Sequence, residues 1–131
     1  MPEIPENLRF SEDHLWAAAA NGSIVQVGVT DYAQQSLGDV IDVRPPDVGR
    51  TVAAGDPCGE VESTKSVNDL IAPITGVVER SNAELSDSPE LINSDPYGDG
   101  WILEFRVNPA TLDEQLAGLM DAGAYRNLAG D

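Results

Sequence analysis

Lys65 is the residue with the clearest chemical potential, because it is the only lysine in a chain of 131 residues. A soluble chain of this length ordinarily carries roughly eight lysines, since about a quarter of its residues are charged. Here six arginines supply the other basic side chains. Arginine carries charge as well as lysine does, but it cannot serve as the amine that forms an amide with a carboxylic acid. Lys65 is therefore either an ordinary solvated lysine or, as we favour, the attachment point of a cofactor.

The segment around Lys65 has the pattern of a β-hairpin. Residues 59–73 read GEVESTKSVNDLIAP, in which two short strand-like runs flank the polar stretch 63–66. Such a pattern predicts two paired strands with the lysine at or near the tip of the turn. A lysine at a hairpin tip is exposed, so another protein can reach its amine.

Other kinds of site find little support in the sequence. One histidine, His14, and one cysteine, Cys58, cannot supply a typical zinc site. A nucleophilic triad would have to use His14, and the chain has neither a G-x-S-x-G motif nor a phosphate-binding glycine loop. An acid/base pair among the many Asp and Glu residues is possible, but solvated surface charge is the more ordinary interpretation. We therefore expect no catalytic residues and no metal.

Charge and cysteine content narrow the partners and the compartment. The formal net charge of −16 repels phosphate, which argues against nucleic acid and against an anionic membrane surface. The same charge suits basic patches on partner proteins, and it equally suits plain solubility. The apolar run at 15–20 is too short to span a membrane, and the first ten residues resemble no signal or transit peptide. A lone cysteine, expected to be buried, fits a reducing compartment, and we predict a cytoplasmic protein.

Short strands separated by glycine and proline dominate the rest of the chain. Residues 23–30 and 101–107 alternate apolar and other side chains, as half-buried strands do. Residues 30–39 predict a short helix that Thr30 caps and Gly38 closes. No interval between strands is long enough for a parallel crossover, so the pattern favours a small antiparallel sandwich or barrel.

The two ends of the chain differ in character. Residues 1–8 are expected to form a loose N-terminus, and residues 110–123 a C-terminal helix. Thr111 and Glu114 have the T-x-x-E spacing of a capping box. Apolar side chains then follow on one face of this helix, which predicts packing against the domain. The length of the whole chain, 1–131, is that of a single domain.

Four stretches, in this order, resemble the H proteins of the glycine cleavage system. They are DHLW at 13–16, GVTDYAQQSLGDV at 28–40, GEVESTKSVNDLIAPITGVV at 59–78 and NAELSDSPELINSDPYGDGWI at 82–102. The resemblance runs from about Arg9 to about Asn127. It implies a mainly β fold, the barrel-sandwich hybrid of lipoyl and biotinyl carriers, built from two small antiparallel sheets with short helices and a C-terminal helix.

The resemblance also implies a function. Lys65 would carry lipoic acid through an amide, attached by a lipoate ligase or a lipoyl synthase route. The chain would be a non-catalytic carrier that moves the aminomethyl group from glycine decarboxylase to the aminomethyltransferase, and a monomer would suit its successive partners. It would then pass electrons to dihydrolipoyl dehydrogenase.

Further site residues follow from the same resemblance. Glu62 matches a hairpin glutamate that the lipoylating enzyme is expected to recognise, and Asp69 matches an aspartate in the cleft for the loaded arm. Ordinary surface acids remain an equal alternative for both. His14 matches the family's H-E-W stretch, although a packing or surface histidine is the more ordinary interpretation. Leu15 stands where the family has a glutamate that helps to hold the aminomethyl amine, and Asp13 is a neighbouring carboxylate that could replace it.

Other functions remain open at this point. The chain could relay lipoyl or octanoyl groups to 2-oxoacid dehydrogenase complexes. A biotin carrier is less favoured, because methionines usually flank the biotinyl lysine, whereas Thr64 and Ser66 flank Lys65. An unmodified binding module would keep a free lysine, and an enzyme with a carboxylate pair would show turnover by itself.

Overall fold

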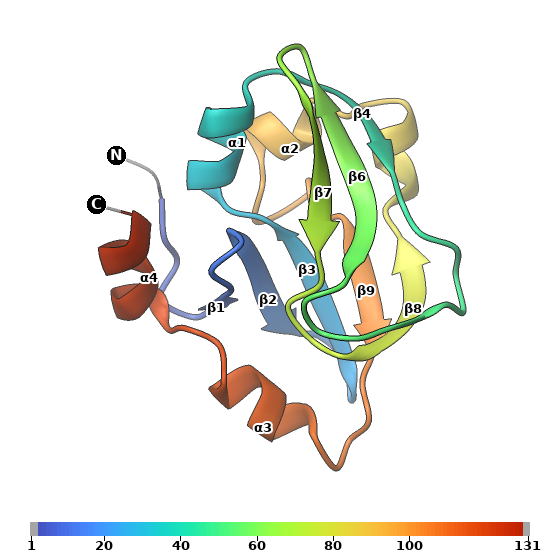
Figure 1. Ribbon diagram of the computed structural model, residues 1–131, viewed down its shortest axis with the longest axis vertical. Helices are drawn as coiled ribbons and strands as arrows, with labels where there is room; N and C mark the ends of the chain where they lie inside the picture. Colours follow the sequence, from blue (N-terminus) through green and yellow to red (C-terminus); the bar gives the residue numbers. More distant parts are fainter. Residues whose placement is uncertain (1–2, 130–131) are drawn as a thin grey trace.

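The computed structural model describes residues 3–129, which form two antiparallel sheets and several short helices (Figure 1). The larger sheet has the order β1 (Arg9–Phe10), β2 (Leu15–Ala19), β3 (Ile24–Val29), β9 (Leu103–Arg106), β8 (Gly76–Ser81) and β5 (Thr51–Val52). The smaller sheet has the order β4 (Val40–Arg44), β6 (Pro57–Ser63) and β7 (Val67–Ile71). The mainly β architecture with two small antiparallel sheets, predicted from the sequence, is confirmed.

The core lies between the two sheets. Val25 and Val27 of β3 and Phe105 of β9 are buried on the inner face of the larger sheet. Val61 and Leu70 cover them from the smaller sheet. Burying each such side chain stabilises the fold by about 1.5–3 kcal/mol. The valines of the alternating pattern at residues 23–30 therefore lie on the face that β3 turns toward the core.

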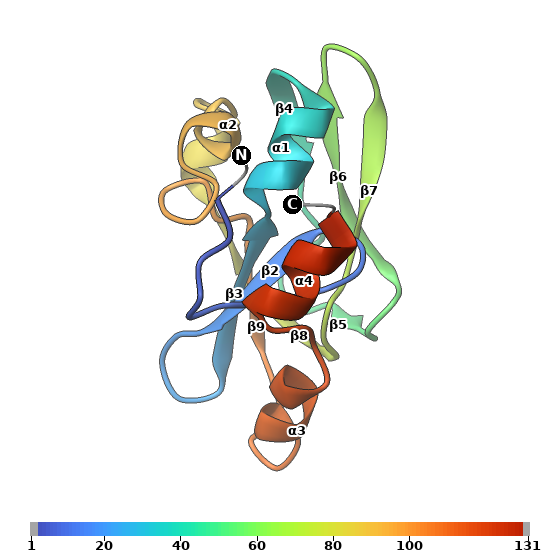
Figure 2. The same cartoon turned by 90° about the vertical axis from the view of Figure 1, so that its left-hand side faces the viewer.

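Helix α1 (Asp31–Leu37) begins and ends as its sequence predicts. The hydroxyl of Thr30 accepts a hydrogen bond from the amide of Ala33 at 3.1 Å, which caps the first turn. Gly38 closes the helix by donating its amide to the carbonyl of Gln34 at 3.1 Å. Figures 1 and 2 show α1 beside the upper part of the β6–β7 hairpin, with the short helix α2 (Leu91–Ser94) packed against it.

The segment between β8 and β9 forms a 3-10 turn before α2. This turn, η1 (Ala83–Ser86), begins at Asn82, whose side chain accepts the amide of Glu84 at 3.1 Å. The amide group of Asn82 also donates to the carbonyls of Asp99 and Trp101, both at 2.8 Å. These bonds fold the segment back onto itself, so that α2 reaches the end of α1.

The C-terminal region contains two helices where the sequence predicted one over 110–123. They are α3 (Leu112–Ala117) and α4 (Ala122–Ala129). Met120 exchanges two backbone hydrogen bonds with Phe10, at 2.8 and 2.9 Å, and this pairing takes the chain out of the helical path. Tyr125 of α4 then stacks on Phe10, with ring centroids 4.7 Å apart.

The expected capping box is also absent from the start of α3. Thr111 makes no side-chain cap bond, and its hydroxyl instead accepts from the side-chain amide of Gln115 and donates to the carbonyl of Asn108, both at 3.2 Å. Three leucines of the predicted apolar stripe still pack against the core, at positions 112, 116 and 119.

The described part of the N-terminal segment is anchored, which differs from the expected loose start. Residues 3–8 form no helix or strand, but Ile4 is buried. The amide of Glu3 donates to the carboxylate of Asp31 at 2.7 Å, and its carbonyl accepts from the hydroxyl of Tyr97 at 2.6 Å. Residues 1–2 of the predicted segment lie outside the described residues.

Candidate cofactor-attachment site

The tip of the β6–β7 hairpin is a tight turn locked by Ser63. The amide of Ser63 donates to the carbonyl of Ser66 at 2.8 Å. Its hydroxyl accepts the amides of Lys65 and Ser66 at 3.2 and 3.3 Å. Ser63 is buried whereas Lys65 is exposed, as the sequence predicted for the hairpin tip. The backbone beneath the lysine is therefore fixed while its amine stays accessible.

The side chain of Lys65 lies against the end of α1. A Cβ atom built on Gly38 would lie 3.1 Å from Cε and 3.5 Å from Nζ of the lysine. Gly38 has φ 77° and ψ −156°, a conformation that is essentially restricted to glycine. The amide of Thr64 donates to the carbonyl of Asp39 at 3.0 Å, which ties the tip to the same turn.

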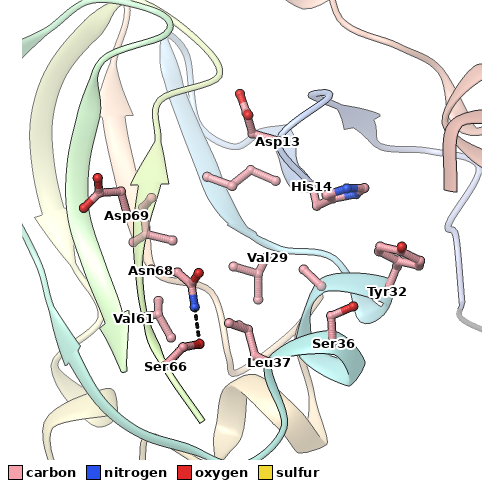
Figure 3. A pocket seen from close by; sticks show the side chains of 13 residues that line it. Asp13, His14, Val29, Tyr32, Ser36, Leu37, Val61, Ser66, Asn68 and Asp69 are labelled. Carbon is pink, nitrogen blue, oxygen red and sulfur yellow. Dashed lines mark hydrogen bonds between the residues drawn. The ribbon is translucent and has the colours of Figure 1, made fainter. Parts of the chain in front are cut away.

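A cleft of about 400 Å³ opens between the hairpin and α1 (Figure 3). Its volume is within the range of small-molecule and cofactor sites. Its walls come from the loop before β2, from the start of β2, from β3, from α1 and from the hairpin. The lining residues are Asp13, His14, Leu15, Val29, Tyr32, Ala33, Ser36, Leu37, Val61, Ser66, Asn68, Asp69 and Leu70. Leu37 lines the cleft directly before Gly38, so the lysine side chain lies near one end of it.

His14 forms part of the cleft wall in a conformation that is uncommon for a residue with a side chain. Its φ is 66°, and two backbone bonds hold it there, to Ser11 at 3.1 Å and from Thr30 at 3.0 Å. Its ring lies 4.7 Å from the ring of Tyr32, and its Nδ1 lies 2.7 Å from the hydroxyl of Tyr125. The structure thus places His14 at the site rather than on an unrelated surface.

Tyr125 connects His14 to the first turn of α1 by a chain of hydrogen bonds. The hydroxyls of Tyr125 and Thr30 lie 2.7 Å apart, and that of Thr30 already accepts the amide of Ala33. We assign the protons accordingly, with Thr30 donating to Tyr125 and Tyr125 donating to Nδ1 of a neutral His14. Sequence reasoning missed Tyr125, since nothing in the local pattern links α4 to a residue 111 positions away.

The environment of His14 predicts that the stability of the fold depends on pH. Burial lowers the pKa of His14, and the neighbouring Asp13 opposes this change. The unfolded chain therefore binds a proton at this residue more readily than the folded chain does. The contribution of the neutral His14 ring to the free energy of unfolding is therefore complete above the unfolded pKa of about 6.5. It is lost as the pH falls below that value, because the unfolded chain takes up the proton first.

We expect the NMR titration of the His14 ring to have its midpoint below that of a histidine in an unfolded peptide. The free energy of unfolding should fall more steeply from pH 7 to pH 5 in the natural chain than in His14→Gln, which retains the carboxylates that titrate in the same range. A midpoint equal to or above the peptide value would contradict the prediction.

Glu62 lies on the side of the hairpin away from the cleft. It is 3.3 Å from the guanidinium of Arg44, which also lies 3.2 Å from Glu60 and 3.5 Å from Asp42. These groups are largely exposed, so their pairing adds little to stability. Glu62 is therefore not brought together with His14, and its predicted role in recognition by a lipoylating enzyme stays a prediction.

Asp69 lies at the rim of the cleft. It pairs with Glu60 across the β6–β7 ladder, whereas its neighbour Asn68 pairs with Val61 of the core face. Figure 3 shows the Asp69 carboxylate turned away from His14, while Asn68 lies above Ser66 and donates to its hydroxyl at 2.8 Å. The polar side chain that β7 turns toward the cleft is thus Asn68. Strand alternation over 67–71 could have shown this, because Asn68 and Leu70 share one face.

Leu15 and Asp13 both line the cleft, at different depths. Leu15 is buried and belongs to the apolar wall. Asp13 is exposed and lies at the rim (Figure 3). An apolar side chain therefore occupies the inner position, and the carboxylate stands two residues earlier at the entrance.

Other kinds of site are not supported by the described part of the chain. Within residues 3–129, no three His, Cys, Asp or Glu side chains are grouped so as to hold a metal ion. None of the helices described there has the length and apolar character needed to cross a bilayer. Cys58 is buried on β6 as predicted, and burial raises the pKa of its thiol to about 11.

Comparison with known proteins decides the family. Residues 8–131 match the family described as glycine cleavage H-protein. The chain belongs to this family. It is 56% identical over 126 residues to the glycine cleavage system H protein of Mycolicibacterium smegmatis, with 96% of each chain covered. It is 50% identical over 131 residues to that of Mycolicibacterium gilvum, with 100% of each covered.

A solved structure supports the same assignment at the level of the fold. The crystal structure of a glycine cleavage system H protein from Mycobacterium marinum matches with a TM-score of 0.86 and 39% identity. The match covers 98% of this chain and 100% of that one. The barrel-sandwich hybrid expected from the resemblance is confirmed, and the lysine hairpin of this H-protein family member is the β6–β7 hairpin.

Proposed function

We propose that this chain is the lipoyl-carrying shuttle of the glycine cleavage system, with lipoic acid joined to Lys65 as an amide. The observation that carries the proposal is the placement of the sole lysine, exposed at a locked hairpin tip and directed along Gly38 beside the cleft. When bound, a lipoyl group supplies a dithiolane that takes up a one-carbon unit and electrons and gives them up again.

The residues around the lysine fit such a group. The exposed amine is free for acylation, and the cleft beside it has apolar walls that include Val29, Leu37, Val61 and Leu70. These apolar residues would exclude water from the part of a lipoyl arm that lies against them, while the polar residues of the lining would stay solvated. The role of the chain is to hold the lipoyl arm and shelter it in the cleft, without catalytic residues of its own.

We propose three successive partners, which are glycine decarboxylase, the aminomethyltransferase and dihydrolipoyl dehydrogenase. A lipoate ligase or a lipoyl synthase route would modify the lysine beforehand. The net charge of −16 favours encounters with basic surfaces on these partners, at rates that fall with salt. A monomer suits a carrier that must visit several active sites, and one cysteine, buried, suits a reducing cytoplasm.

A reconstituted exchange assay tests the function. Purified glycine decarboxylase, glycine and labelled bicarbonate are combined with the lipoylated chain or with its unmodified form. We expect exchange of label into glycine in proportion to the lipoylated chain, and none above background with the unmodified form. A fully lipoylated chain that supports no exchange would overturn the shuttle and favour a relay of acyl groups. A chain that accepts no lipoate would favour an unmodified binding module.

A further inference from the structure

We propose that Asn93 is a positioning residue for Lys65, acting through the turn that follows α1. In relation to lipoylation, this inference rests on the function proposed above. Asn93 belongs to α2, and its side chain does not line the cleft. Its effect on the lysine is therefore indirect, through hydrogen bonds to the backbone on which the hairpin tip rests.

The carboxamide of Asn93 bonds on both sides of Asp39. Its oxygen accepts the amide of Val40 at 2.9 Å, and its nitrogen donates to the carbonyl of Gly38 at 2.8 Å. The same nitrogen donates to the side-chain oxygen of Gln34 at 3.1 Å. Only a side chain that both donates and accepts can make this set of bonds, which explains why an amide is needed here.

Asp39 links this clamp to the hairpin. Its carbonyl accepts the amide of Thr64, the residue before Lys65, at 3.0 Å. The neighbouring Val40 pairs with Ser63 in the β4–β6 ladder, and Gly38 lies under the lysine side chain. The peptide groups that support the tip are thus fixed by a residue more than 50 positions away in the sequence.

The clamp is needed because Gly38 is the most permissive residue of the turn. A glycine has more backbone freedom than any other residue, and the turn would sample several conformations without an external constraint. When Asn93 holds Gly38 and Val40, the Asp39 carbonyl stays aimed at Thr64. Asn93 thus holds the Lys65 amine in a single orientation that the lipoylating enzyme can reach, and it keeps the aliphatic part of the lysine side chain beside the cleft.

The first test uses the unmodified chain, so that it does not depend on the proposed function. Hydrogen exchange of the Thr64 amide is followed by NMR in the natural chain, in Asn93→Ala and in Asn93→Asp. The aspartate keeps the size and can still accept from Val40, but it cannot donate to Gly38. We expect about tenfold faster exchange at Thr64 in both variants, as follows when one hydrogen bond loses its support.

Asn82→Ala is the matched control. The side chain of Asn82 also makes three hydrogen bonds, to Asp99, Trp101 and Glu84, and none of them is to the hairpin or the turn after α1. This variant should lower global stability without a selective effect at Thr64. Two results would overturn the proposal. One is an equal increase in the exchange rate of the Thr64 amide in Asn82→Ala and Asn93→Ala, and the other is an exchange rate in Asn93→Asp equal to that of the natural chain.

The second test measures lipoylation with a lipoate ligase, ATP and lipoate. If only part of the Asn93→Ala population presents the lysine, the apparent KM rises in inverse proportion to that fraction while kcat changes little. We expect KM to rise by about three- to tenfold and kcat to stay within about twofold. An unchanged KM would overturn the role in modification. Absence of lipoylation in the natural chain would instead overturn the proposed function, and the exchange test at Thr64 would still decide the role of Asn93.

Discussion

Lys65→Arg is expected to gain no lipoyl mass under conditions that modify the natural chain to completion. Arginine keeps the positive charge and an aliphatic stem at the hairpin tip, so charge-based contacts remain. Its guanidinium stays protonated at every accessible pH and does not act as the amine of an amide bond. Since Lys65 is the only lysine, no other side-chain amine can replace it.

Intact mass spectrometry gives the answer directly. Both chains are treated with a lipoate ligase and lipoate, and the natural chain is expected to gain one lipoyl increment while the variant gains none. The variant should also fail to support glycine–bicarbonate exchange. Because Lys65 is exposed, the free energy of unfolding of Lys65→Arg should match that of the natural chain to within about 0.5 kcal/mol in a thermal unfolding experiment. A lipoyl increment on Lys65→Arg would show another acceptor and would contradict the assignment.

Features that depend on neighbouring residues could be predicted from the sequence. The unusual status of Lys65 is visible in the composition alone, and its place at a hairpin tip follows from the two flanking strand patterns. The limits of α1 follow from Thr30 and Gly38, which act within one turn of the helix. The burial of Cys58 agrees with the expectation for a lone cysteine in a reducing compartment.

Contacts between distant segments could not be predicted in this way. Tyr125 meets His14, and Asn93 meets the turn around Asp39, although no local pattern relates their positions. The pairing of Met120 with Phe10 interrupts a stretch whose local sequence favours one continuous helix. In each case a tertiary hydrogen bond decides the outcome, and only the folded arrangement shows it.

For the acidic residues of the hairpin, the sequence pattern was informative but did not by itself show which way each side chain points. Alternation along β6 and β7 divides each strand into two faces. The register between the strands then decides which faces coincide, and it pairs Asp69 with Glu60 on the side that also carries Glu62. A resemblance transfers residue types to positions, but the direction of each side chain had to come from the register.

Gly59→Ala is expected to lower the free energy of unfolding by about 2–6 kcal/mol, for two separate reasons. Gly59 lies where the β6–β7 register shifts, and its φ of 122° is strained for any residue with a side chain. That strain costs about 1–3 kcal/mol. A Cβ atom there would also lie 2.7 Å from the backbone carbonyl oxygen of Arg44 on β4. Relieving this overlap requires moving backbone, at a cost of about 1–3 kcal/mol.

Gly55→Ala separates the two costs. Gly55 has φ 91°, but a Cβ built there meets nothing within 4 Å, so this variant should lose only the strain contribution. Urea unfolding of both variants gives the difference, which measures the overlap between β6 and β4. Equal losses in the two variants would mean that β4 yields without cost. A larger loss in Gly59→Ala would show that the close β4–β6 approach is rigid, and this ladder continues to Val40 and Ser63 at the base of the lysine turn.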